Sequence, residues 1–147
     1  MKFDVDIQKK FNLKNIKLDL HRELNFAGDV IKEDHFKRLE RGEGVNGQMK
    51  PLADSTVIAK GFDQTLVNED SMRNLQVKRA TRARQVVELS LHSKRKRNGV
   101  TDAQIGAFHQ EGGGNLPKRE WFGVTKKSEK RALKIIELKI DKLLKNA

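Results

Sequence analysis

The stretch IGAFHQEGGGNLPKREWFG, residues 105–123, organises the rest of the chain. It opens with an apolar helical turn, passes through three consecutive glycines and ends on an aromatic pair. Glycine gives the backbone access to positive φ angles, whereas proline fixes φ and removes a donor, so the loop is loose at one end and stiff at the other. The aromatic pair is predicted to re-enter the core as a short strand. We predict that the stretch is a structural latch made by His109, Gln110, Gly112, Pro117, Arg119, Trp121 and Phe122.

A long helix is predicted upstream, over residues 15–41. Its apolar stripe recurs at helical spacing at Ile16, Leu20, Leu24, Ala27 and Ile31, and continues at Leu39. Asn15 is predicted as the N-cap and Gly42 as the residue that ends the helix. Gly28 predicts a bend or close packing, because glycine costs about 1 kcal/mol against alanine inside a helix. Residues 42–50, rich in glycine, are predicted to be a mobile connecting loop.

Further helices are predicted downstream. A short one over residues 102–110 has Thr101 as its cap, and a long one begins after Thr125 and reaches about Lys145. The long helix is expected to bury a stripe made of Ala132, Leu133, Ile136, Ile140 and Leu143, widened by Ile135, Leu138 and Leu144.

Two segments between these helices alternate apolar and polar residues, at 75–81 and 85–92. A tight connection around residues 81–84 makes them an antiparallel hairpin. Few strands and several helices predict an α+β fold, in which a small antiparallel β-sheet, the hairpin plus the short strand, packs against a long N-terminal and a long C-terminal helix.

The chain is predicted to be one α+β domain over residues 15–147, with a basic loop near 93–100. Residues 1–14 are expected to form an N-terminal arm or short strand, because apolar residues alternate there over a short distance. In an assembly this arm would be buried between subunits through Phe3, Ile7 and Phe11; the open alternative is that it caps the sheet of its own chain.

The net charge of +11 is unevenly distributed. Residues 1–75 are neutral, residues 76–99 carry eight Lys and Arg against Glu88 alone, and residues 126–147 carry eight against three acids. Such asymmetry predicts a face that meets phosphates or an acidic protein, although a role in solubility stays open. The candidate residues for contact with DNA in a channel, or for docking on a partner, are Lys78, Arg79, Arg82, Arg84, Lys94, Arg95, Lys96 and Arg97.

The sequence shows little reactive chemistry. The chain has no cysteine, and its four histidines lack the spacing of a metal site. No serine has a nucleophile elbow around it. His109 could be half of an acid–base pair, but hydrogen bonding that fixes a turn is the favoured interpretation. We therefore expect no enzyme, no cofactor and no metal. The absence of a long apolar run or an apolar leader predicts a protein made in a cytoplasm, with no membrane partner.

Four short segments occur in the order found in a known family. They are Pro51-Leu52 with Thr56 and Lys60, Leu66-Val67 with Ser71 and Met72, GAFHQEG at 106–112, and PKREWFG at 117–123. Together they resemble the virion morphogenesis (tail-completion) family of tailed phages, typified by a Mu-like phage protein. The sequence departs from the family pattern at Met49 and Lys50, where a tryptophan is expected before the Pro-Leu pair. The basic run at 94–97 looks like an insertion.

The resemblance implies a structural virion protein, a tail-completion or neck component at the head–tail junction. It would form a homo-oligomeric ring around the DNA channel and contact neighbouring neck, connector, tail-terminator or tail-tube proteins, with non-specific DNA in the channel. Its location would be the virion, and the host cytoplasm during assembly.

The alternative is a nucleic-acid-binding module that uses the basic 78–97 hairpin and the basic C-terminal helix. No aromatic residue interrupts the basic run and the chain has no tyrosine, so bases have no stacking platform there. The order of the motifs favours the assembly protein.

Overall fold

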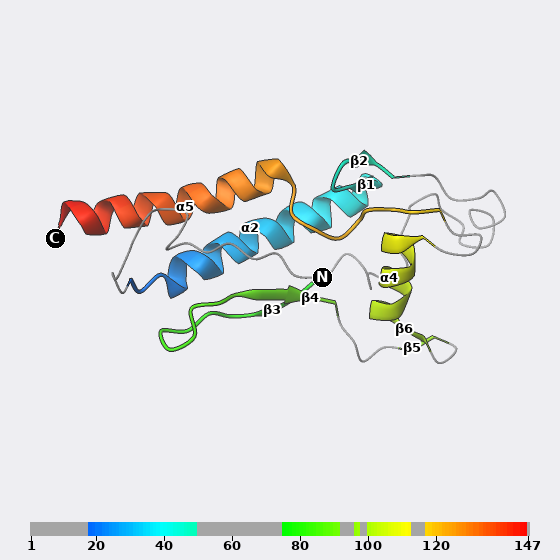
Figure 1. Cartoon of the computed structure of the whole chain (residues 1–147), viewed down its shortest axis with the longest axis horizontal. Coiled ribbons are helices and arrows are strands. Elements are labelled where there is room, and N and C mark those ends of the chain that lie inside the picture. Colours follow the sequence, from blue (N-terminus) through cyan, green and yellow to red (C-terminus); the bar gives the residue numbers. More distant parts are fainter. Residues whose placement is uncertain (1–17, 50–74, 92–95, 98–99, 113–116, 147) are drawn as a thin grey trace.

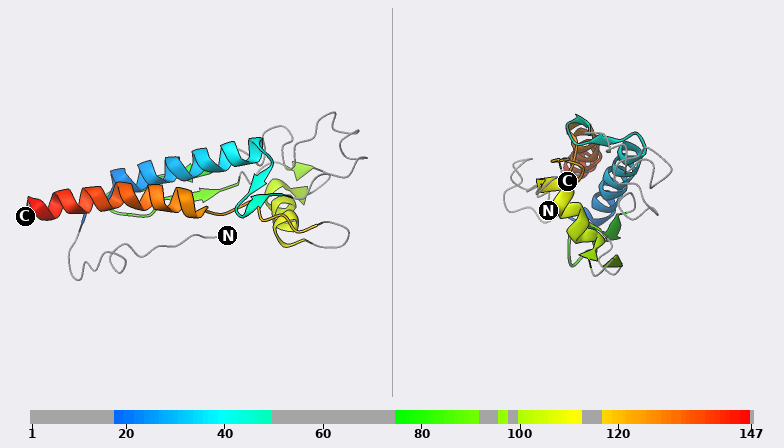
Figure 2. Two further views of the ribbon diagram at one scale, coloured as in Figure 1. Left: turned by 90° about the horizontal axis from the view of Figure 1, so that it is seen from above. Right: turned by 90° about the vertical axis from the view of Figure 1, so that its right-hand side faces the viewer.

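Two helices of 20 residues each form the long axis of the computed structural model, which describes residues 18–49, 75–91, 96–97, 100–112 and 117–146. They are α2, His21–Glu40, and α5, Lys126–Lys145, and they lie side by side (Figures 1 and 2). Lys139 contacts Glu23 at the start of α2, whereas Thr125 contacts Asp34 near its end, so the helices are antiparallel. With the three small antiparallel sheets found among the described residues they make an α+β fold, as predicted.

An aliphatic seam joins α2 to α5. Its buried members are Leu20, Ala27, Ala132, Ile136 and Ile140. Thr125 begins α5 as predicted, because its Oγ1 accepts a hydrogen bond from Ser128 N at 3.1 Å. The predicted widening of the α5 stripe is wrong at Leu138 and Leu144, which are 57% and 47% exposed. One neighbouring helix covers only a narrow strip of α5, so these leucines lie outside it.

The start of α2 also differs from the prediction. Residues 18–20 are described and are not helical, so the helix begins at His21 rather than after Asn15, which itself lies outside the described residues. Leu20 N donates to Gln85 Oε1 at 2.7 Å, and Asp19 Oδ1 lies 2.5 Å from His21 Nδ1. Gln85 therefore holds the backbone just before the first turn from a distant part of the chain, and a local contact such as that of Asp19 competes with helix formation.

The predicted hairpin is present on the other side of α2. Strand β3, Gln76–Lys78, pairs antiparallel with β4, Glu88–Ser90, and Thr81 N donates to Arg84 O at 2.8 Å in the turn. The strands are shorter than predicted because Asn25 on α2 binds both backbone groups of Ala80, at 2.7 and 3.0 Å. Close packing at Gly28 is confirmed, since a Cβ there would lie 2.9 Å from Val87 Cγ2.

Two smaller hairpins complete the described strands. Strands β1, Glu43–Gly44, and β2, Gly47–Gln48, pair where a connecting loop was predicted. Gly47, with φ +115°, makes the turn between them possible. Strands β5, Lys96–Arg97, and β6, Val100–Thr101, pair immediately before α4, Asp102–Glu111, whose position agrees with the predicted short helix.

The predicted strand at Trp121 and Phe122 is wrong. Residues 117–125 form no strand, and they run from the α4 end of the molecule to the start of α5 (Figure 1). The backbone N–H groups of Trp121 and Phe122 both donate to the Gln110 side chain instead of to a neighbouring strand. A side-chain acceptor has therefore replaced the β-ladder.

Candidate functional site

Gln110 joins the end of α4 to the aromatic pair. Its Oε1 accepts from the N–H groups of Trp121 and Phe122, each at 3.1 Å, and its Nε2 donates to Phe122 O at 3.4 Å. The amide thus satisfies three backbone groups that no strand pairs. Glutamine suits this position because its side chain carries both an acceptor and a donor.

The indole of Trp121 fills the centre of this region. It has no exposed surface, and its Nε1 donates to Gly106 O on α4 at 2.8 Å. Leu39 at the end of α2 is equally buried against it, and the His35 ring centroid lies 5.7 Å away. A Cβ at Gly106 would lie 2.5 Å from Trp121 Cζ2, so only glycine lets α4 approach this closely.

Arg119 and His109 make a second connection between the same segments. Arg119 N donates to His109 O at 2.7 Å, and Arg119 Nη1 lies 3.1 Å from His109 Nδ1. Arginine is a donor only, so His109 Nδ1 accepts this bond. Burial lowers the pKa of the Arg119 guanidinium from its ordinary value. His109 thus has a backbone and a side-chain role in the turn.

The turn between these segments begins at Gly112, where φ is +71°. A Cβ there would lie 3.1 Å from Lys118 N, so glycine meets both a conformational and a spatial requirement. Pro117 is half-buried at the other end of the turn. We call the predicted group, His109, Gln110, Gly112, Pro117, Arg119, Trp121 and Phe122, the latch.

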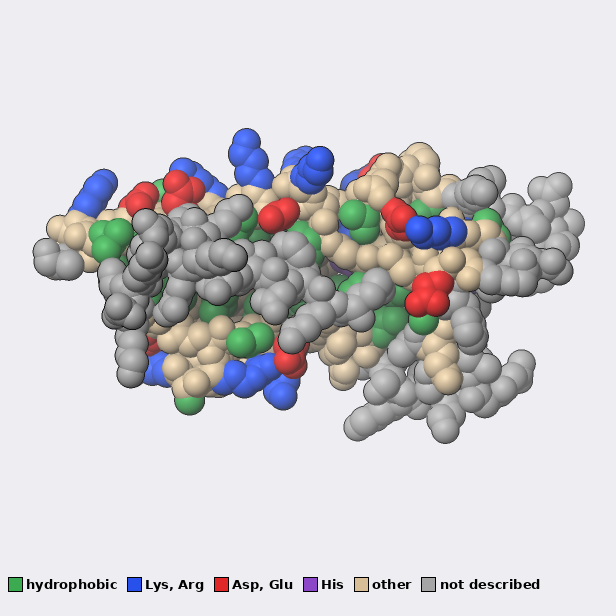
Figure 3. All heavy atoms as spheres, in the orientation of Figure 1, with side chains coloured by type: hydrophobic (Ala, Val, Ile, Leu, Met, Phe, Trp, Pro, Cys, Tyr) green, Lys and Arg blue, Asp and Glu red, His purple; other side chains and the backbone are tan. Residues whose placement is uncertain are grey.

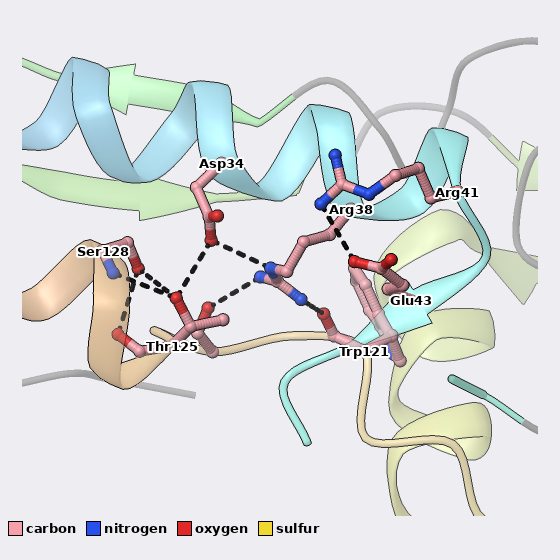
Figure 4. A network of polar contacts seen from close by, with 8 residues as sticks. Asp34, Arg38, Arg41, Glu43, Trp121, Thr125 and Ser128 are labelled. Carbon is pink, nitrogen blue, oxygen red and sulfur yellow. Dashed lines mark hydrogen bonds and ion pairs between the residues drawn. The ribbon is translucent and has the colours of Figure 1, made fainter. Parts of the chain in front are cut away.

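Arg38 on α2 holds the latch from the opposite side, and the sequence analysis missed it. Its Nε donates to Asp34 Oδ2 at 2.9 Å, its Nη1 to Trp121 O at 3.4 Å and its Nη2 to Gly123 O at 3.2 Å (Figure 4). Thr125 Oγ1 also reaches Asp34 Oδ2, at 3.4 Å. The Arg38 side chain is only 4% exposed. The spacing of Asp34 and Arg38, i and i+4, was the available signal.

Three of the arginines predicted to face DNA or a partner, those in the connection between β3 and β4, are paired within the chain. Arg79 lies 2.8 Å from Asp29, Arg82 3.3 Å from Asp19 and Arg84 2.7 Å from Glu88. The hydrogen bond from Arg79 to Asp29 raises the pKa of that guanidinium. Lys78 is exposed. We call Lys78, Arg79, Arg82 and Arg84 the hairpin cluster.

The described part of the basic run at 94–97, Lys96 and Arg97, is separate from the hairpin cluster. Residues 81–84 form the tip of the β3–β4 hairpin, whereas Lys96 and Arg97 lie in β5 beside α4, at the other end of the molecule (Figure 1). The predicted single basic element over 78–97 is therefore two separate ones. Lys94 and Arg95 lie outside the described residues, as do Phe3, Ile7 and Phe11 of the predicted arm.

The outer face of α5 is a second cationic surface, absent from the predicted site residues. Lys and Arg side chains line the edge of the molecule over α5 (Figure 3). The exposed cations of this helix are Lys126, Lys127, Lys130, Arg131, Lys134, Lys142 and Lys145. The dense basic composition of 126–147 indicates this surface, and the alternative function uses the basic C-terminal helix as a whole.

Within the described part of the chain, no three His, Asp or Glu side chains are grouped as metal ligands. No helix among the described residues has the length and apolar character needed to cross a bilayer. No protein family, curated protein or solved structure matches this chain.

Proposed function

We propose that this chain is a structural virion assembly protein of a tailed phage, a tail-completion or neck component at the head–tail junction that forms a ring around the DNA channel. The observation that carries the proposal is the latch. The two segments with the most detailed resemblance to the tail-completion family, 106–112 and 117–123, bind each other through Gln110, Trp121 and the pair His109–Arg119.

The latch supports a structural role because its polar groups are engaged in holding backbone. Gln110 binds three backbone groups, Trp121 binds Gly106 O, and Arg38 binds two carbonyls. Side chains committed to backbone in a buried region are poorly placed to move protons on a substrate. Packing and hydrogen bonding are thus sufficient reasons for these residue types in the two segments.

The test is the mass of the purified protein by size-exclusion chromatography with light scattering, alone and co-expressed with the products of the adjacent genes. The proposal expects one discrete oligomer of several subunits, either alone or on a partner. A monomer under both conditions would overturn the ring. Adjacent genes that encode no portal, capsid or tail protein would overturn the phage assignment.

One observation favours the alternative, a nucleic-acid-binding module, namely the exposed cations of α5. The basic hairpin, the other element of this alternative, supports it less, because each arginine of the hairpin cluster has an acidic partner in the same chain. Gel shifts with a steep salt dependence, from a protein that stays monomeric, would favour the module.

A further inference from the structure

We propose that the outer face of α5 binds the phosphate backbone of duplex DNA without sequence preference, and that the hairpin cluster does not. The inference rests on the proposed function for the presence of DNA and names the surface that would face it. The α5 face, as we define it, consists of Lys127, Lys130, Arg131, Lys134, Lys142 and Lys145.

Helical periodicity places these cations along one side of α5. Successive positions on this side are three or four residues apart, at 127, 131, 134, 138, 142 and 145, and Lys130 is three after 127 and four before 134. The side lies opposite the buried Ser128, Ala132, Ile136 and Ile140. From Lys127 to Lys145 the helix rises about 27 Å. A duplex presents about 16 phosphate charges over that length, because it carries one per roughly 1.7 Å. Between these cations, the same side of α5 exposes Leu138 and Asp141.

The α5 face keeps most of its charge available. Among the described residues, the ion pairs of α5 cations are Lys134 with Glu137 at 3.8 Å and Lys139 with Glu23 at 3.7 Å. Both distances are close to the limit for an ion pair. The hairpin cluster differs, since two of its three arginine pairs measure 2.8 Å or less. Any phosphate that binds the hairpin cluster must therefore compete with a carboxylate already in contact.

The residue types on α5 favour duplex backbone over other acidic partners. Five of the six cations are lysines, which act as point charges, whereas specific docking on carboxylates favours the arginine fork. No aromatic residue occurs between positions 126 and 145, so single-stranded bases have no stacking platform on this helix. Phosphate contacts alone carry no sequence information.

Two variants of equal charge test this assignment. The α5 variant replaces Lys127, Lys130, Arg131 and Lys134 by Gln, and the hairpin variant replaces Lys78, Arg79, Arg82 and Arg84 by Gln. Each removes four positive charges from exposed or half-buried side chains, and glutamine is a good helix former on α5. A third variant, Lys127→Arg with Lys130→Arg and Lys134→Arg, keeps the charge. Circular dichroism checks that each is folded.

The measurement is binding of a labelled 30-base-pair duplex of random sequence by fluorescence anisotropy, from about 50 to 200 mM salt. If about four phosphates are neutralised, the wild-type affinity should fall about 100-fold over this range, with a logarithmic slope near −4. The α5 variant should bind at least tenfold more weakly at 50 mM salt, with a slope near −1. The hairpin and arginine variants should stay within about threefold of wild type.

Three results would overturn the inference. One is equal loss of binding in the α5 and hairpin variants, which would show a response to net charge alone. The second is absence of wild-type binding at 50 mM salt. The third is binding of single-stranded DNA or RNA more than tenfold tighter than duplex. A monomer that binds DNA through α5 would leave this inference standing while the ring fails, and a ring that ignores DNA would do the reverse.

Discussion

The two ends of α2 are packed by different kinds of chemistry. At its first half, small and medium aliphatic side chains meet α5 in a seam that contains no aromatic residue. At its last turns, Leu39, His35 and Arg38 meet a tryptophan, a phenylalanine and a set of hydrogen-bonded carbonyls. The seam distributes its burial over many side chains, whereas the latch depends on one large one.

This difference separates what holds the molecule together from what sets its shape. The seam gains stability through apolar burial, which is non-directional and tolerates similar side chains. At the latch, hydrogen bonds of Gln110, Trp121 and Arg38 fix α4 and residues 117–123 against α2, and these bonds are directional. We therefore expect single substitutions in the latch to cost more than those elsewhere.

Trp121→Ala should have the largest effect. Removing a fully buried indole costs about 3–5 kcal/mol of unfolding free energy, and it also removes the bond to Gly106 O. Urea denaturation followed by circular dichroism measures this. Leu138→Ala is the control, because that side chain is mostly exposed, and it should change stability by less than about 0.5 kcal/mol. Equal midpoints for the two variants would contradict a buried latch.

Arg38→Met should cause the second-largest loss of stability. It leaves Asp34, 19% exposed, without its cation and two carbonyls without their donor, which costs about 3 kcal/mol. Arg41→Met removes an equivalent charge three residues later, but the Arg41 side chain is 54% exposed, so water screens its pairing with Glu43 and its loss should change stability much less. Thermal unfolding of both variants gives the comparison. Similar losses would show that Arg38 acts as an ordinary surface charge.

Alanine at two helical glycines sharpens the comparison. Gly106→Ala should destabilise by about 1–2 kcal/mol, because the new methyl meets the immobile Trp121 ring and this exceeds the gain in helix propensity. Gly28→Ala meets only Val87, which is half-buried and can rotate, so the change should stay within about 0.5 kcal/mol of wild type. Chemical denaturation resolves the two. The reverse order would place the tighter packing at the hairpin.

The smallest effect should be pH-dependent. Hydrogen bonds from Lys118 and Asn46 hold the pKa of Glu120 below its ordinary 4.5. A depressed folded-state pKa contributes stability above the unfolded pKa, and this is lost as pH falls through the folded value. The difference in urea midpoint between wild type and Glu120→Gln should thus be present at pH 7 and shrink toward pH 3. A difference that grows on acidification would reverse the assigned sign.

The seam could be predicted from sequence because it is local and periodic. The spacing of Ala132, Ile136 and Ile140 gives the buried side of α5, and Thr125 marks its start. The β3–β4 hairpin could be predicted from the alternation of apolar and polar residues in its two strands. The predicted burial of Leu138 and Leu144 was wrong, because periodicity shows which residues can share a face but not how much of that face a neighbouring helix covers.

The latch could be predicted only in part. Its glycines, proline and aromatic residues marked the stretch, yet a strand was predicted because the acceptor for Trp121 N and Phe122 N is a side chain 11 and 12 residues earlier. Arg38 binds carbonyls more than 80 positions away, which no local pattern encodes. Counting charges along the sequence likewise did not predict the pairing of Arg79 with Asp29, because that pairing depends on the three-dimensional positions of the two side chains.

The most direct test of the proposed assembly role is electron microscopy of particles made with and without this chain. The coding sequence is deleted from the genome that carries it, and wild-type or Trp121→Ala protein is supplied from a plasmid. We expect unjoined heads and tails in the deletion, joined particles with the wild-type copy, and few joined particles with the variant. Joined, infectious particles in the deletion, or no tailed particles from the intact genome, would contradict the account.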